Sequence, residues 1–286
     1  MGFNTWNRFL DSRGFPRIEE LTEDSVLELA RAQVDSGMLA AGYEYFVLDD
    51  GYQAFSRDSQ GRLQGHPRRF RSGIAALVKE VKALGLKMGM YAVPGRYTCL
   101  DQYFDYHGFG NGSLGFEEID AITFAEWGVD YLKYDWCRAH LNDGLEAPTS
   151  FEMMANALNE HAPHIVYSIS EYGLFNPHTW APEFANLWRT TDDLFASWKS
   201  ILATIDLQIG LDSYSRPGAW NDPDMLQIGN HGLTFSENRA HMIMWAVLNA
   251  PLMAGNDLAS MTDEVRTILC HKGLIAVNQD WGGRQG

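Results

Sequence analysis

Asp130-Tyr-Leu-Lys-Tyr-Asp135 is the stretch from which the expected fold of this chain follows. Its aromatic and aliphatic run is typical of a buried strand, and the carboxylate at its end needs a partner or a solvated edge. Four further segments also end in acidic residues, and most of them follow strand-like runs: Tyr45-Phe-Val-Leu-Asp-Asp50, Ile165-Val-Tyr-Ser-Ile-Ser-Glu171, Leu187-Trp-Arg-Thr-Thr-Asp-Asp193 and Ala219-Trp-Asn-Asp-Pro-Asp224. This repetition predicts that strand ends converge on one polar site, as they do at the mouth of a (β/α)8 barrel.

Helix-like and strand-like patterns alternate along the rest of the chain. Apolar residues at helical spacing follow Thr22, which is expected to cap a helix. Further helices are expected around 74–84, 117–127, 150–161 and 242–248. Strands are expected at 2–6, 43–48, 86–91, 129–134 and 165–169, with strand starts at 184–188, 219–220 and 251–254. About eight strands suit a closed α/β barrel, so we predict one (β/α)8 TIM barrel forming a single catalytic domain over residues 1–286.

The composition limits the classes of protein to consider. The chain has 286 residues and is 45% hydrophobic, which is enough for one large core. Its formal net charge of −15 argues against nucleic acid or an anionic membrane as a partner. No apolar stretch approaches the roughly 20 residues that span a bilayer. No signal peptide is visible, and Met1 already enters a structured motif, which leaves room for a leader or other upstream segment.

Two pairs of charged residues give the clearest signal for chemistry. Lys133 and Asp135 are two apart on a strand and share one side of it, so the cation would keep the carboxylate ionised, as a nucleophile requires. A structural ion pair is the competing interpretation, and this tripeptide alone slightly favours it. Arg189 and the adjacent Asp192 and Asp193 supply the second candidate: one of the two acids can enter the site, and it can give and take a proton if burial or a nearby carboxylate raises its pKa. Two carboxylates facing each other across a cleft are typical of glycoside hydrolysis.

Asp49 and Asp50 offer two acceptors at another strand end, which suit sugar hydroxyls or a hard metal ion. The histidine spacings do not match a zinc motif, so a zinc site is not expected. We find neither a Gly-x-Ser-x-Gly elbow nor a Walker-type loop. The aromatic segment 100–109 follows a strand, and it forms either a wall of the pocket or a loop packed on its own hydrophobic cluster.

The chain has three cysteines. Cys99 and Cys137 follow adjacent strands of the expected barrel, which would bring them close enough to form a disulfide at its rim. The alternative is that both remain reduced thiols. A disulfide would imply an oxidising compartment. Cys270 is expected to be a buried free thiol.

The chain resembles glycoside hydrolase family 27, the α-galactosidase and α-N-acetylgalactosaminidase group. The resemblance covers nearly the whole chain in order, and its Leu-Lys-Tyr-Asp and Trp-Asn-Asp-Pro-Asp-Met-Leu segments together are highly specific. The matching segments are Met1-Gly-Phe-Asn-Thr-Trp-Asn-Arg-Phe9, Leu48-Asp-Asp-Gly51, Gly85-Leu-Lys-Met-Gly-Met-Tyr91, Tyr131-Leu-Lys-Tyr-Asp-Trp-Cys137, Trp188-Arg-Thr-Thr-Asp-Asp193, Trp220-Asn-Asp-Pro-Asp-Met-Leu226, Ala250-Pro-Leu-Met-Ala-Gly-Asn-Asp257 and Ile275-Ala-Val-Asn-Gln-Asp280.

The resemblance implies a retaining α-glycosidase that needs no metal or organic cofactor. Asp135 falls on the nucleophile of the family and Asp193 on its acid/base. Cys99 and Cys137 fall on the family's disulfide beside the nucleophile, which implies a secreted, periplasmic or lysosome-like location. The positions that fall on substrate-binding residues are Trp6, Asp49, Asp50, Tyr91, Lys133, Glu171, Arg189, Asp224 and Met225.

We therefore expect an exo-acting α-galactosidase that hydrolyses terminal α-D-galactosides by double displacement, because a large acid such as Glu171 suits a free 2-hydroxyl. Departures from the family pattern at Gly51, Val93, Tyr172 and Asp192 keep other substrates open. The alternatives are an isomalto-dextranase, a β-L-arabinopyranosidase, an α-N-acetylgalactosaminidase or an inactive sugar-binding barrel. The family's C-terminal β-sandwich is absent from this chain, which we expect to be a barrel-only piece or a protein that has lost that module.

Overall fold

The computed structural model describes residues 1–104, 106 and 111–286 of the chain and shows a closed parallel barrel. The strand order is β7-β6-β5-β4-β3-β2-β1-β8. Leu226, which follows β7, makes a parallel bridge to Ala254 in β8, and this bridge closes the ring. The strands are β1 Gly2–Asn4, β2 Tyr45–Leu48, β3 Lys87–Ala92, β4 Tyr131–Asp135, β5 Val166–Ser170, β6 Leu187–Arg189, β7 Trp220–Asp222 and β8 Met253–Ala254.

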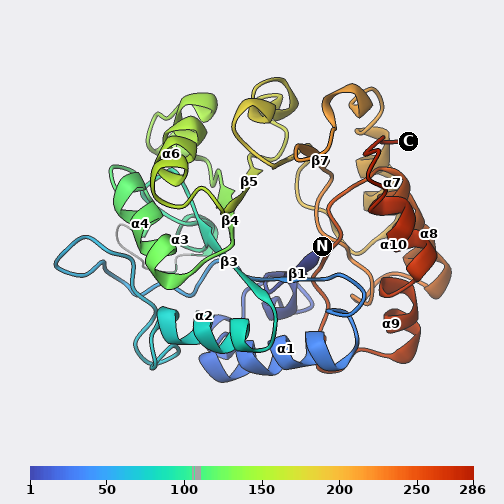
Figure 1. Cartoon of the computed structure of the whole chain (residues 1–286), viewed down its shortest axis with the longest axis horizontal. Coiled ribbons are helices and arrows are strands. Elements are labelled where there is room, and N and C mark those ends of the chain that lie inside the picture. Colours follow the sequence, from blue (N-terminus) through green and yellow to red (C-terminus); the bar gives the residue numbers. More distant parts are fainter. Residues whose placement is uncertain (105, 107–110) are drawn as a thin grey trace.

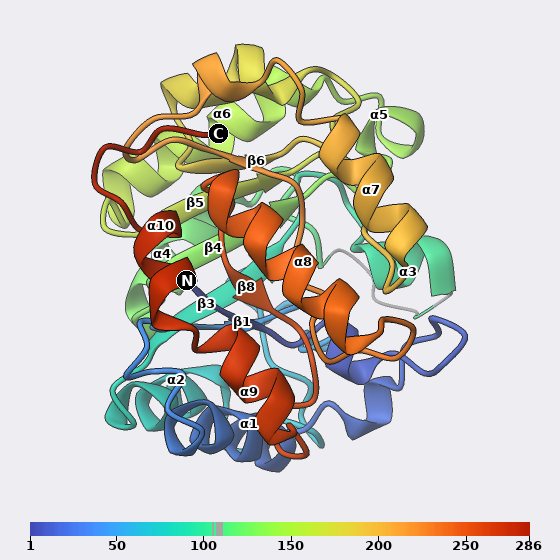
Figure 2. The same ribbon diagram turned by 90° about the vertical axis from the view of Figure 1, so that its right-hand side faces the viewer.

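The helices surround the strands as an outer layer (Figure 1). Thr22 caps α1 as predicted, because its hydroxyl accepts from the backbone N–H of Ser25. Along one flank α8, α9 and α10 pack side by side (Figure 2). The α-helices are α1 Glu23–Asp35, α2 Ile74–Ala83, α3 Cys99–Phe104, α4 Glu117–Trp127, α5 Ala139–Asn142, α6 Ala147–His161, α7 Trp198–Asp206, α8 Phe235–Val247, α9 Asp263–Leu269 and α10 Lys272–Asn278; short 3-10 helices span Asn7–Phe9, Ile18–Glu20, Pro177–Thr179, Ala181–Glu183 and Asp212–Tyr214.

The predicted (β/α)8 barrel is thus confirmed, although helices α3, α5, α7 and α10 were not predicted and one predicted helix differs in its start. The helix expected at 242–248 begins seven residues earlier, at Phe235, where Thr234 and Glu237 form a reciprocal cap. Its first turns bury Asn238 and His241, so hydrophobic spacing alone does not reveal them. Within 100–109 the structure forms part of α3, and Phe109 lies outside the described residues.

The barrel interior is built in layers from alternate strands. Val47, Tyr131, Leu187 and Met253, from β2, β4, β6 and β8, form one buried cluster. Because side chains of a strand alternate between its faces, the residues two positions further on also point inward. These residues are Asp49, Lys133 and Arg189, so the apolar interior becomes a charged layer toward the carboxyl ends of the strands. Among the described residues, every helix is too short or too polar to cross a membrane.

Candidate active site

Asp135 is the last residue of β4 and lies at the centre of the site. Its side chain is buried, with 6% of the residue exposed. The Oδ1 atom accepts a hydrogen bond of 2.9 Å from the backbone N–H of Trp136. Burial raises the pKa of the Asp135 carboxyl, and the nearby Lys133 ammonium acts in the opposite direction. The backbone donor and the cation therefore partly offset the effect of burial on Asp135.

Lys133 connects β4 to the acidic pair that follows β2. Its Nζ lies 2.7 Å from Asp49 Oδ2, and Asn4 donates to the same oxygen from its Nδ2 at 2.5 Å. The Lys133 ammonium also lies 5.4 Å from the centroid of the Tyr91 ring. The tripeptide pattern slightly favoured a structural ion pair for Lys133, and the structure places that pair with Asp49, while the cation still acts on Asp135.

Asp50 is as deeply buried as Asp49 and accepts from two backbone donors. Its Oδ2 accepts from the backbone N–H of Leu100 at 2.9 Å, and its Oδ1 accepts from Gly51 at 2.7 Å. Burial raises the pKa of the Asp50 carboxyl to about 8. Asp50 thus fixes the start of α3 over the barrel mouth.

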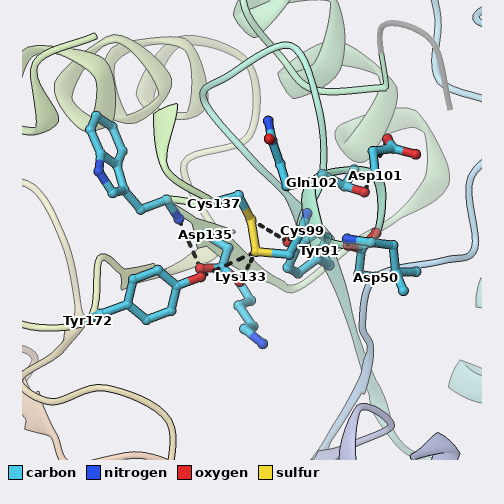
Figure 3. The surroundings of a disulfide bond; sticks show 12 residues. Asp50, Tyr91, Cys99, Asp101, Gln102, Lys133, Asp135, Cys137 and Tyr172 are labelled. Atoms are coloured by element: carbon cyan, nitrogen blue, oxygen red, sulfur yellow. Dashed lines mark hydrogen bonds between the residues drawn. A yellow bond between two sulfur atoms is a disulfide. The ribbon is translucent and has the colours of Figure 1, made fainter. Parts of the chain in front are cut away.

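A disulfide joins Cys99 at the start of α3 to Cys137, two residues beyond Asp135 (Figure 3). Cys99 Sγ lies 3.6 Å from Asp135 Oδ2, and the Tyr91 hydroxyl lies 3.1 Å from Cys137 Sγ. Of the two states left open by the sequence, the structure has the oxidised one, which fits an oxidising compartment. Cys270 is a free thiol and is only partly buried, so the expected burial is incomplete.

Arg189 organises the opposite wall of the site. Its guanidinium lies 3.0 Å from Asp224 Oδ1 and 3.2 Å from Asp193 Oδ1. Burial raises the pKa of the Asp224 carboxyl to about 7, although Arg189 counteracts this. The Asp193 side chain is 58% exposed, so it stands at the mouth of the site in contact with solvent. Asp135 and Asp193 both raise the pKa of Lys133, and Asp193 also acts to raise the pKa of the Asp135 carboxyl.

The remaining predicted residues occupy different depths. Glu171 is fully buried, and its Oε2 accepts from the backbone N–H of Phe175 at 2.9 Å. Burial raises the pKa of the Glu171 carboxyl to about 8. Met225 lines a small cavity inside the barrel together with Lys133, Arg189 and Asp224. Trp6 follows β1 and is partly exposed.

Two residues near the site, Asn4 and Tyr172, were not predicted as functional, while Tyr103 belongs to the segment for which a wall of the pocket was one of two predictions. Asn4 supports Asp49, Tyr103 on α3 feels the charges of both Asp135 and Asp193, and the Tyr172 hydroxyl points toward Asp135 (Figure 3). Tyr103 also lies under the Arg138 guanidinium, at 4.7 Å from its ring centroid. The position of Tyr103 supports the prediction that segment 100–109 borders the site. Phe104 instead packs against Phe15, as expected if the segment forms its own aromatic cluster.

Two further features of the structure could concern a ligand, a hollow beside α3 and a buried group of three residues. A hollow of about 520 Å³ beside α3 contains none of the predicted site residues; it is lined by Phe15, Pro16, Ile18, residues 100–104 and Tyr106. Cys99, Asp135 and Cys137 form the one group of three possible metal ligands among the described residues. Because the two sulfur atoms are bonded to each other, they do not offer the thiolates that a metal would require.

The comparisons with known proteins agree on one family. A family model described as Alpha galactosidase A matches residues 1–280. The alpha-galactosidase of Oryza sativa subsp. japonica is 41% identical over all of this chain, which spans 64% of that relative. The alpha-galactosidase A of Homo sapiens is also 41% identical over all of this chain, which spans 67% of it. A Saccharomyces cerevisiae alpha-galactosidase solved with raffinose has a TM-score of 0.86 at 28% identity, covering 99% of this chain and 64% of that one.

Proposed function

The chain belongs to the Alpha galactosidase A family, glycoside hydrolase family 27, and from this premise we propose that it is a retaining, exo-acting α-galactosidase. The observation that carries the proposal is the buried Asp135 at the end of β4, with the solvent-exposed Asp193 across the same charged region. Two carboxylates in unlike surroundings suit two different roles. We propose that residues 1–286 act as one catalytic domain on a terminal α-D-galactoside.

In the proposed reaction, an Asp135 oxygen attacks the anomeric carbon while Asp193 gives its proton to the leaving oxygen. The products of this step are the free aglycone and a sugar bound covalently to Asp135. Asp193, now ionised, takes a proton from water as the water attacks the same carbon and releases Asp135. Two displacements return the original configuration. The exposure of Asp193 suits the second step, because water must reach it.

The other charged groups supply the sugar-binding positions of the proposal. Asp49 and Asp50 present carboxyl groups near the inner end of the site, and Lys133 provides donors beside them. Glu171 and Arg189 are the groups proposed to lie near the 2-hydroxyl. The Oε1 atom of Glu171 is buried without a hydrogen-bond partner among the described residues, so it has free acceptor capacity for a sugar hydroxyl.

A panel of p-nitrophenyl glycosides tests the proposal. We expect the α-galactoside to be cleaved fastest, and Asp135→Asn to lose activity by several orders of magnitude while keeping its fold. Asp130→Asn is the matched control, because Asp130 precedes the same strand at its other end and pairs with Lys82 at 2.8 Å. Preference for an α-glucoside, a β-L-arabinopyranoside or an α-N-acetylgalactosaminide would replace the assigned substrate. Near-normal turnover by Asp135→Asn would overturn the mechanism.

The disulfide also bears on the cellular compartment of the protein. The Cys99–Cys137 disulfide lies beside the proposed nucleophile, and it persists only where thiols are oxidised. We propose a secreted, periplasmic or lysosome-like protein. Fractionation with an antibody, together with thiol labelling before and after reduction, would test this location.

A further inference from the structure

Tyr172 has a backbone conformation that directs its side chain into the site. It follows Glu171 in the loop after β5, and its φ of 65° lies in the left-handed region, which residues other than glycine rarely adopt. The next residue, Gly173, has a φ of 75°, and a Cβ atom there would lie 2.3 Å from the carbonyl oxygen of Thr190. The turn is therefore fixed on both sides, and such conformations persist where the surrounding structure determines them.

The Tyr172 hydroxyl ends beside the disulfide and the carboxylate of Asp135 (Figure 3). Its oxygen lies 3.3 Å from Cys99 Sγ, which itself lies 3.6 Å from Asp135 Oδ2. Cys99 is in a disulfide and has no proton to donate. The phenol has one proton, and a carboxylate is a much stronger acceptor than a disulfide sulfur. The carboxylate is therefore the better acceptor for the hydroxyl proton, and the phenol acts to lower the pKa of the Asp135 carboxyl.

Other charged and titratable groups act on Asp135 from the surrounding elements. Trp136 supplies a backbone donor to Oδ1, and Tyr91 points its hydroxyl at Cys137 instead. Tyr172, in contrast, directs its hydroxyl toward the Asp135 carboxyl and acts to lower its pKa. The groups that act on Asp135 are Lys133 on β4, Arg189 on β6, Asp49 after β2, Asp193 after β6, Tyr91 on β3, Tyr103 on α3 and Tyr172 after β5.

We propose that Tyr172 is a positioning residue for the nucleophile, whose hydroxyl holds the Asp135 carboxylate in one orientation and in its ionised form. This inference rests on the proposed function only for the role of Asp135 as nucleophile, since the placement of the Tyr172 hydroxyl beside the carboxylate belongs to the fold itself. A phenol that donates to a carboxylate stabilises its charged form and opposes the effect of burial. Tyr172 supplements Lys133, whose own closest carboxylate is Asp49.

Tyr172→Phe removes the hydroxyl and leaves the ring. A hydrogen bond to a charged group typically changes an ionisation equilibrium by about tenfold or more, so the titration midpoint of Asp135 should rise by roughly one pH unit. The matched control is Tyr167→Phe, since Tyr167 on β5 is also buried and donates its hydroxyl to the carbonyl oxygen of Phe151, away from the site. That variant should leave the midpoint unchanged.

The midpoint is measured by carbon NMR of protein labelled at the aspartate carboxyl carbons, with the Asp135 signal identified by its loss in Asp135→Asn. In parallel, the acid limb of the kcat/KM profile for p-nitrophenyl α-galactoside should move to higher pH by the same amount. Identical midpoints and identical acid limbs in Tyr172→Phe and the wild type would overturn the inference. If the wild type cleaves no glycoside, the proposed function fails, and the NMR titration still decides the role of Tyr172.

Discussion

Replacing Lys133 by Met should destabilise the protein strongly, because it leaves a buried carboxylate without its cation. The Lys133 and Asp49 side chains are 16% and 2% exposed, and their charged atoms lie 2.7 Å apart. Breaking a buried pair by removing one partner costs about 3–5 kcal/mol of unfolding free energy. For a chain of this size, that corresponds to a melting temperature lower by roughly 10 °C.

The pairwise part of this loss is isolated by a double-mutant cycle of Lys133→Met and Asp49→Asn, measured by urea unfolding with tryptophan fluorescence. We expect the double variant to be more stable than the sum of the two losses predicts, by at least about 1.5 kcal/mol. The control pair is Lys87 and Glu44, which also lie 2.7 Å apart but are 48% and 50% exposed, so their coupling should stay below about 1 kcal/mol. Additive losses at Lys133 and Asp49, within about 0.5 kcal/mol, would refute the reasoning.

Two further predictions concern pH and redox state. In the folded protein the pKa values of Asp50 and Glu171 are each raised to about 8. Both acids therefore stabilise the folded state fully below their unfolded pKa near 4, and this contribution is lost as the pH rises to 8. The melting temperature should fall from pH 5 to pH 8, and it should fall less in Glu171→Gln; a melting temperature that does not change with pH would contradict this. The Cys99–Cys137 disulfide closes a loop of 38 residues. Replacing both cysteines by serine should therefore lower the unfolding free energy by about 4 kcal/mol, and it should reduce activity because α3 is held less firmly. Unchanged stability to urea in the double variant would count against this prediction.

The sequence is most informative where a local period determines the outcome. Alternation along Asp130–Asp135 predicts that Lys133 and Asp135 share a face, and the structure places both at the inner, carboxyl end of β4. Thr22 likewise predicts the start of α1, because a cap depends only on residues three positions away. The barrel follows from many such local signals repeated in order.

Other features depend on contacts between distant segments, and no local pattern reveals them. Lys133 pairs with Asp49, 84 residues earlier, only because β2 and β4 place both side chains inside the barrel. The early start of α8 is hidden by buried polar residues such as His241. Tyr172 differs from the family pattern in sequence, but its role depends on a left-handed turn that aims the hydroxyl at Asp135.

The attachment of the sugar to Asp135 is the central chemical claim, and covalent trapping tests it most directly. A fluorinated α-galactosyl substrate that forms the intermediate faster than it is hydrolysed should increase the protein mass by one sugar residue. Proteolysis and mass spectrometry should then place the sugar on the peptide that contains Asp135. Label on another carboxylate, or turnover that releases the β-anomer as first product, would contradict the account.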